Sequence, residues 1–308
     1  MNAHPHIADN EIAVVHNGII ENNKKLREDL LKQGCTLDSE TDSELIAHSV
    51  LLYIRAGQDF LTAVRSTMSD LEGSFAIGLI RRTEPKRLIA ARCGSPLVIG
   101  LGKDENYISS DQNAILSLTR KFIYLEEGDM ADINFEKVEI YDRNNAIVSR
   151  PVHDSSVNQA SISKGKHSHF MLKEIFEQPD AVLSELKDHL LKKSVRNDTF
   201  GDNSSPLFSS IQRIQIVACG TSYHASLVAK YWLEEIAGIP CQVEIASEYR
   251  YRNKVIESDT LFVTLSQSGE TADTLAALIL AKKSGYAATL TICNAPESSI
   301  AREQISFS

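Results

Sequence analysis

The stretch IQIVACGTS, residues 214–222, decides the fold of the second half of this 308-residue chain. It reads as a buried strand that ends at a glycine and leads directly into the helix SYHASLVAKYWLEEIAG (222–238). The same unit recurs at TLFVTLSQSGET (260–271), which leads into TADTLAALILAKKSG (271–285). With CQVEIAS (241–247) and ATLTICN (288–294), these strands predict an α/β domain whose parallel sheet is covered on both faces.

Two loops in this half carry hydroxyl groups where strands end and helices begin. They are CGTS (219–222) and SQSGET (266–271). Ligands of open parallel sheets bind at this edge, and hydroxyls with free N–H groups at a helix N-terminus bind phosphate. No basic residue lies between Thr264 and Leu280, so neutral donors would hold the anion. The candidate donors are Thr221, Ser222, Ser266, Gln267, Ser268 and Thr271.

Other interpretations of these loops remain open. Serine and threonine at these positions could simply cap the helices. A Rossmann dinucleotide site is disfavoured because neither loop reads GxGxxG, and a P-loop is excluded because Gly-Lys-Ser/Thr is missing. Cys219 could act as a nucleophile, but a thiol that ends an apolar strand is more often buried and inert.

The first 150 residues predict an α+β domain with antiparallel sheets. EIAVVH (11–16) reads as a strand that ends in the turn pair Asn17-Gly18. Helices are predicted from Asn22 or Asn23 to Gly34, over 45–54 and over 60–71. Short strands then follow one another, including SFAIGLIRR (74–82), RLIAARC (87–93) and the hairpin VEIYDRNNAIV (138–148). Such short consecutive strands favour antiparallel pairing, with helices packed on the sheet.

Apolar periodicity disappears at PVHDSSVNQASISKGK (151–166), which predicts a linker. We therefore expect one domain over 1–150, a linker over 151–168 and a second domain over 169–308. A helix over 169–191 should be interrupted at Pro179, and RNDTFGDNSSP (196–206) should form a loop. The chain stops just after the fourth parallel strand, so we expect the second domain to be incomplete.

Composition and charge narrow the class of protein. A net charge of −9 without a basic cluster argues against nucleic acid as a partner. No apolar run approaches the ~18 residues that span a bilayer, so no membrane partner is expected. Five scattered cysteines without CxxC or CxxH spacing indicate reduced thiols in the cytoplasm. No metal site is expected, because no acidic residue completes one with His4, His6 and His16.

Several motifs resemble the family of glutamine–fructose-6-phosphate aminotransferases. VACGTSYHASLVAKYWLEEIAGIPCQVEIASEYRYR (217–252) and TLSQSGETADTLAAL (264–278) are similar to its first sugar-isomerase (SIS) domain. NAHPH, VVHNGIIEN, SETDSE, GSPLVIGLG, SSD and FIYLEEGD resemble its glutaminase domain, a type 2 amidotransferase with an Ntn-hydrolase-like fold. KEIFEQP resembles the segment that opens the isomerase half. The resemblance covers essentially the whole chain, with the motifs in the same order.

The resemblance implies roles for particular residues. In the family, the two hydroxyl loops hold the phosphate of fructose 6-phosphate, a role that passes to all six candidate donors. Asn17 and Gly18 match the oxyanion hole that stabilises the tetrahedral intermediate on the glutamine side chain. Asp42 matches the carboxylate that holds the α-amino group of glutamine, and His16 could shape the same pocket. Without the family, Asn17-Gly18 would be a hairpin turn and Asp42 a helix cap.

The reaction that the resemblance implies is amide nitrogen transfer from L-glutamine to D-fructose 6-phosphate. Its products are glucosamine 6-phosphate and glutamate, and it feeds hexosamine and UDP-N-acetylglucosamine synthesis. The resemblance implies no cofactor, and it implies a homodimer joined through the isomerase halves. These properties are expectations for the full-length parent enzyme.

Parts of the family pattern have no counterpart in this sequence. The family's N-terminal cysteine nucleophile is missing, and its ring-opening and isomerising residues would lie beyond Ser308. We therefore expect an internal stretch of the enzyme that binds substrates but is inactive alone. One alternative is a non-catalytic phosphosugar-binding SIS regulator, in which HNGIIEN and SETD would have no use. Others are a glutaminase relative with a different acceptor, which SQSGET opposes, and a fragment that folds poorly.

Overall fold

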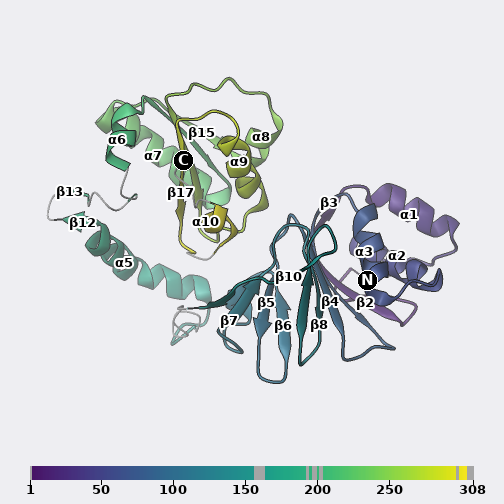
Figure 1. Ribbon diagram of the computed structural model, residues 1–308. Coiled ribbons are helices and arrows are strands. Elements are labelled where there is room, and N and C mark those ends of the chain that lie inside the picture. Colours follow the sequence, from purple (N-terminus) through teal and green to yellow (C-terminus); the bar gives the residue numbers. More distant parts are fainter. Residues whose placement is uncertain are drawn as a thin grey trace. The chain divides into compact units, whose positions relative to one another are not determined.

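The computed structural model describes residues 2–155, 164–191, 194–195, 200, 204–295 and 298–303. The chain separates into two compact units, residues 1–163 and residues 164–308 (Figure 1). The first unit holds antiparallel sheets with helices and the second a parallel sheet, which confirms the predicted fold classes. Among the described helices, none is long and apolar enough to cross a membrane.

A seven-stranded antiparallel sheet forms the centre of the first unit. Its order is β1-β2-β3-β4-β8-β9-β10. The strands are β1 (His6–Ala8), β2 (Ile12–Ile20), β3 (Gly73–Arg81), β4 (Leu88–Cys93), β8 (Met130–Ile133), β9 (Val138–Tyr141) and β10 (Ile147–Val148). One face is covered by the helices α1 (Asn23–Lys32), α2 (Ser43–Arg55) and α3 (Phe60–Asp70).

A second, four-stranded antiparallel sheet packs on the other face. Its order is β11-β7-β5-β6, with β5 (Val98–Leu101), β6 (Asn106–Ser109), β7 (Lys121–Tyr124) and β11 (Val152–Asp154); a short helical turn, η1 (Gln112–Ala114), precedes β7. Side chains alternate along β3, so Phe75 and Ile77 join the core under the helices. Ala76 joins Ile99 and Ile123 in the core between the sheets. The unit is therefore a stack of helices, sheet and sheet.

Two strands of this unit differ from the prediction. β2 does not end at the Asn17-Gly18 pair but runs on to Ile20, because β3 pairs with its whole length, up to Ile20 opposite Gly73. The pair is therefore not a hairpin turn. Residues 152–154 are not linker but form β11, because Val152 pairs with Ile123 of β7. Residues 156–163 of the predicted linker lie outside the described residues.

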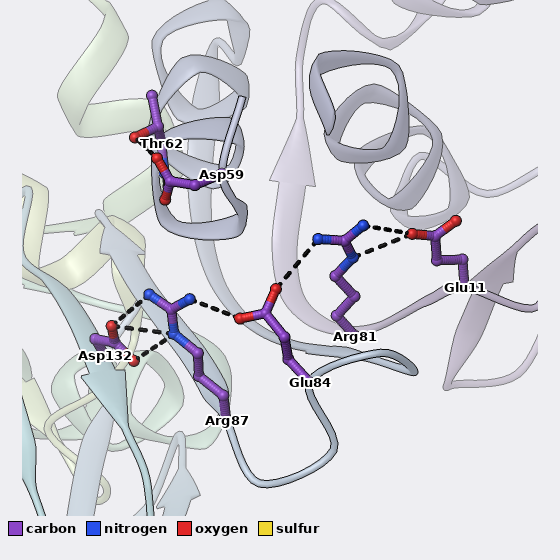
Figure 2. A network of polar contacts seen from close by, with 7 residues as sticks. All are labelled: Glu11, Asp59, Thr62, Arg81, Glu84, Arg87 and Asp132. Carbon is purple, nitrogen blue, oxygen red and sulfur yellow. Dashed lines mark hydrogen bonds and ion pairs between the residues drawn. The ribbon is translucent and has the colours of Figure 1, made fainter. Parts of the chain in front are cut away.

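A network of charged side chains fixes the turn between β3 and β4 (Figure 2). Arg81 donates to Glu11 at 2.8 Å and to Glu84 at 3.1 Å. Arg87 donates to Glu84 at 2.7 Å and to Asp132 at 2.6 Å. The five side chains are only 17–31% exposed. Hydrogen bonding to Asp132 raises the pKa of Arg87, so the network stays charged.

The second unit is built on a four-stranded parallel sheet of order β15-β14-β16-β17. The strands are β14 (Arg213–Ala218), β15 (Cys241–Ile245), β16 (Thr260–Ser266) and β17 (Ala288–Cys293). On one face, Ile216 shares a core with Leu233 of α7 (Gly220–Ala237) and with α6 (Ser204–Ser210). On the other face, Val217 shares a core with α8 (Ala246–Tyr251) and α9 (Ala272–Lys282). The short helix α10 (Ser299–Glu303) follows β17.

The start of this unit corrects two predictions. Helix α5 (Phe170–His189) runs through Pro179 without interruption, so the proline lies within the helix instead of ending it. Strands β12 (Leu190–Leu191) and β13 (Ser194–Val195) pair after it. Of the predicted loop over 196–206, residues 204–206 belong to α6, because that helix already begins at Ser204. Residues 196–199 and 201–203 are outside the described part of the chain.

Candidate functional site

The parallel sheet reverses its winding between β14 and β16. The chain passes from β14 to β15 on one side and then returns to β16 on the other side of β14. The helices that follow these two strands, α7 and α9, lie on opposite faces of the sheet. Such a switch point leaves a crevice at the carboxyl ends of the two strands. Both predicted hydroxyl loops begin at the carboxyl ends of these two strands.

The first loop enters α7 through Gly220, whose φ of +58° lies in the left-handed region that favours glycine. Thr221 and Ser222 form the first turn of the helix, with Thr221 exposed and Ser222 half-buried. One turn further on, the Ser226 hydroxyl donates to the Ser222 carbonyl oxygen at 2.8 Å. Two hydroxyls therefore lie at the positive end of an 18-residue helix.

The second loop is folded by its own hydroxyl groups. The Gly269 N–H donates to Ser266 Oγ at 3.0 Å, and the Glu270 N–H donates to Ser268 Oγ at 3.2 Å. The expectation of free N–H groups is therefore wrong for these two residues. Ser266 is only 6% exposed, whereas Gln267 and Ser268 are exposed. Each serine hydroxyl accepts one bond here and keeps its hydrogen to donate.

The N-cap residues of the two helices are Cys219 for α7 and Thr271 for α9. In these two fully described helices, neither side chain makes a cap hydrogen bond. Helix capping therefore does not explain the Thr271 hydroxyl, which lies half-buried at the start of α9.

A basic residue reaches the start of α9 from a distant part of the sequence. Arg250 of α8 donates to Asp273, in the first turn of α9, at 2.8 Å. This ion pair offsets a carboxylate that would otherwise weaken anion binding at the helix N-terminus. The sequence between Thr264 and Leu280 holds no basic residue, so this cation comes from outside that stretch. The acidic Asp273 beside the candidate phosphate loop was the signal in the sequence for a basic partner from elsewhere.

In the first unit, the sheet requires glycine at position 18. Gly18 has a φ of +142°, and a Cβ built on it would lie 2.0 Å from the Ser74 carbonyl oxygen and 2.8 Å from Phe75 Cα. No other residue fits without moving the neighbouring strand. Asn17 and Gly18 are both exposed on β2, so the Asn17 side chain and the Gly18 backbone are accessible to solvent.

Asp42 is bonded to β2 instead of capping α2. Its Oδ2 accepts from the Ile20 N–H at 2.8 Å, and α2, described in full, has no side-chain cap bond. The next residue, Ser43, places its Oγ 2.9 Å from Nδ1 of His16, the residue before Asn17. Two hydrogen bonds therefore hold the strand that carries Asn17 to the segment that carries Asp42.

Buried histidines lie around this contact. Burial lowers the pKa of His16, against a smaller opposing effect of Asp42, and burial likewise lowers the pKa of His48 beside Glu44. These imidazoles are therefore neutral near pH 7. Within the described ranges, no group of three or more His, Cys, Asp or Glu residues could hold a metal ion.

The cysteines of the first unit are Cys35 and Cys93. Burial raises the pKa of both thiols, and for Cys93, where Glu127 adds to the effect, the value is about 11. A protonated thiol is a poor nucleophile. Neither cysteine is therefore prepared to attack glutamine.

Two domain families match the two units. The glutamine amidotransferase domain matches residues 2–117, and the SIS domain matches residues 207–306. The glutamine–fructose-6-phosphate aminotransferase (isomerizing) of Idiomarina loihiensis is 53% identical over 302 residues, and that of Shewanella oneidensis is 50% identical over 302 residues. The sequence is therefore similar to aminotransferases of this name along nearly its whole length. Each alignment covers 98% of this chain and 50% of the relative, so the chain spans about half the length of the curated relatives it matches.

A solved structure is also similar in sequence. It is the C-terminal domain of the glucosamine-fructose-6-phosphate aminotransferase from Francisella tularensis, at 50% identity and a TM-score of 0.45. The similarity covers 46% of this chain and 40% of that chain.

The aminotransferase motifs thus fall into two groups, one in each unit. Thr221 and Ser222 follow β14, and the SQSGET residues follow the adjacent strand β16. In the other unit, Asn17 and Gly18 lie close to Asp42 through the Ile20–Asp42 bond. The contacts that hold these groups in position leave no local sequence pattern, because the bonded residues are 23 to 29 positions apart.

Proposed function

We propose that this chain carries the glutamine-handling part and a phosphosugar-binding part of an enzyme that transfers the amide nitrogen of L-glutamine to D-fructose 6-phosphate. The products are glucosamine 6-phosphate and glutamate. The observation that supports this most strongly is the pair of hydroxyl loops on adjacent strands at the switch point. The names of the relatives with 53% and 50% identity support the substrate pair. The whole enzyme works in the cytoplasm as a homodimer without a cofactor.

The phosphate of the sugar is held by neutral donors at two helix N-termini. Both helix dipoles point their positive ends at the crevice, and hydroxyl groups supply hydrogen bonds to the phosphate oxygens. The donors are Thr221, Ser222, Ser266, Gln267, Ser268 and Thr271. Because these donors carry no charge, the phosphosugar can dissociate readily after the reaction.

Glutamine is bound in the first unit beside β2. The Asn17 amide and the Gly18 N–H stabilise the negative oxygen that develops when the side-chain carbonyl of glutamine is attacked. Asp42 attracts the α-amino group of glutamine, and its bond with Ile20 keeps the carboxylate next to that strand. The buried, neutral His16 adds no competing positive charge.

We expect no glutamine hydrolysis by residues 1–308 alone. The first unit contains two cysteines, and burial keeps the thiols of Cys35 and Cys93 protonated. An assay for ammonia release by the purified chain tests this. Hydrolysis above the rate of a denatured control would contradict it.

The phosphosugar site is tested by isothermal calorimetry with fructose 6-phosphate, with fructose as the control ligand. The loss of one hydrogen bond to a charged oxygen should make Ser266→Ala bind about tenfold more weakly. The matched control is Ser258→Ala, because Ser258 is an exposed serine just before the first residue of β16, at the opposite end from Ser266. Equal binding of fructose and fructose 6-phosphate, or no effect of Ser266→Ala, refutes the site.

The same experiment separates this proposal from a non-catalytic phosphosugar regulator. An aminotransferase fragment binds L-glutamine as well, and Asp42→Asn weakens that binding because it removes the charge that attracts the α-amino group. A regulator binds the phosphosugar and not L-glutamine.

A further inference from the structure

The second hydroxyl loop is held from behind by the segment that opens α10. Oε1 of Glu270 accepts a hydrogen bond from the Ser299 N–H at 2.9 Å. The Ile300 N–H donates to the Gly269 carbonyl oxygen at 3.0 Å. Two consecutive residues of the loop are therefore bonded to two consecutive N–H groups of a segment about 30 residues further on.

This contact is tightly packed. Gly269 has a φ of +67°, and a Cβ there would lie 2.0 Å from Ser298 Oγ and 2.7 Å from Cys293 Sγ. Ser298 and Ser299 are each 4% exposed, and Ile300 is fully buried. A buried contact with no spare volume fixes the position of the loop more firmly than an exposed one would.

The charge of Glu270 makes its bond important for anion binding. Glu270 lies in the middle of a loop whose other polar side chains are neutral, and a carboxylate near a phosphate repels it. Its bond to the Ser299 N–H keeps the carboxylate on the side of the 298–300 segment. The other carboxylate nearby, Asp273, is similarly engaged by Arg250 at 2.8 Å.

We infer that Glu270 is a positioning residue for phosphosugar binding, acting through the Ser299 N–H and not by touching the ligand. The inference rests on the proposed phosphosugar site. The bond holds the SQSGET loop in the shape that presents Ser266 and Thr271 to the crevice, and it removes the Glu270 charge from the phosphate. What matters is therefore an acceptor oxygen at position 270 and an N–H at position 299.

Four variants test this in the full chain, with fructose 6-phosphate binding measured by calorimetry. Glu270→Ala removes the acceptor and should weaken binding about tenfold. Glu270→Gln keeps an acceptor oxygen and should restore affinity to within about threefold of the unmodified chain. Ser299→Pro removes the N–H at the first position of a helix, where proline is tolerated, together with the hydroxyl that accepts from Arg302, and should match Glu270→Ala. Ser299→Ala keeps the N–H and should bind normally.

The double variant Glu270→Ala/Ser299→Pro should be no weaker than either single variant, because both remove the same bond. Additive losses, or equal losses for Glu270→Gln and Glu270→Ala, overturn the inference. If the unmodified chain binds no fructose 6-phosphate, the proposed function fails. The bond is then judged by hydrogen exchange of residues 298–303. Faster exchange in Glu270→Ala than in Glu270→Gln supports the bond, and equal exchange contradicts it.

Discussion

Replacing Gly18 by alanine should destabilise the first unit far more than the same change at another glycine with positive φ. At Gly18 the new Cβ meets the Ser74 carbonyl oxygen at 2.0 Å, and the φ of +142° is one that L side chains rarely adopt. Gly57 is the matched control, since its φ is +96° but no atom lies within 4 Å of the added Cβ.

The magnitude follows from the difference between the two sites. A non-glycine residue held in an unfavourable backbone region costs about 1–3 kcal/mol, and this cost applies to both variants. At Gly18 the backbone of β3 must also move by roughly an ångström, a strain that adds about 2 kcal/mol or more. Gly18→Ala should therefore lose at least about 2 kcal/mol more of unfolding free energy than Gly57→Ala.

Urea denaturation followed by circular dichroism measures this difference. The transition of the first unit should shift to a clearly lower urea concentration in Gly18→Ala than in Gly57→Ala. Equal midpoints for the two variants would refute the argument that β3 requires glycine at position 18. It would also remove the physical reason for placing an oxyanion hole there.

Three further predictions concern stability and reactivity. Burial lowers the pKa of His16 below 6.5, so the unfolded chain binds this proton more readily than the folded chain. The folded state is therefore destabilised as the pH falls below 6.5. Urea titrations at pH 7.5 and 5.5 should therefore show a smaller loss in His16→Gln, and an equal loss contradicts the shift. Arg87→Ala should lower the free energy of unfolding by about 2 kcal/mol, because it leaves the largely buried Asp132 without its partner. The control Arg55→Ala breaks a pair that is about half exposed and should cost under about 1 kcal/mol. Similar losses for the two variants in thermal melts would argue against the network. With a pKa of about 11 instead of 9.0, Cys93 should hold about 100-fold less thiolate at pH 8 than an ordinary cysteine. It should therefore react slowly with iodoacetamide, as measured by peptide mapping. A rate equal to that of glutathione would refute this prediction.

The sequence predicted the parallel sheet of the second unit well, because its strands and the helices between them carry strong periodic patterns. The strand before Cys219 and the helix after it appear at the expected residues, and Gly238 ends that helix in a left-handed conformation. The local structure of the first unit was harder to predict from sequence. Asn17-Gly18 has the composition of a hairpin turn, and only the long-range pairing of β2 with β3 keeps it within a strand.

Contacts that position the site could not be predicted either, because they too join residues far apart in the sequence. The Glu270–Ser299 bond and the Arg250–Asp273 pair each join residues more than 20 positions apart, and no periodic pattern connects them. The packing of α10 against the loop depends on small side chains at contact, such as Ser298 against Gly269. A pattern of residue types indicates which groups can bind phosphate, but the fold decides which neighbours hold them.

The most direct test of the central claim is a map of amide chemical shifts in the ¹⁵N-labelled chain during titration with fructose 6-phosphate. The account predicts saturable shifts confined mainly to residues 219–222 and 266–272, at the ends of β14 and β16, and no such shifts with fructose. Shifts that cluster elsewhere in the second unit, or that fructose produces equally well, would contradict it.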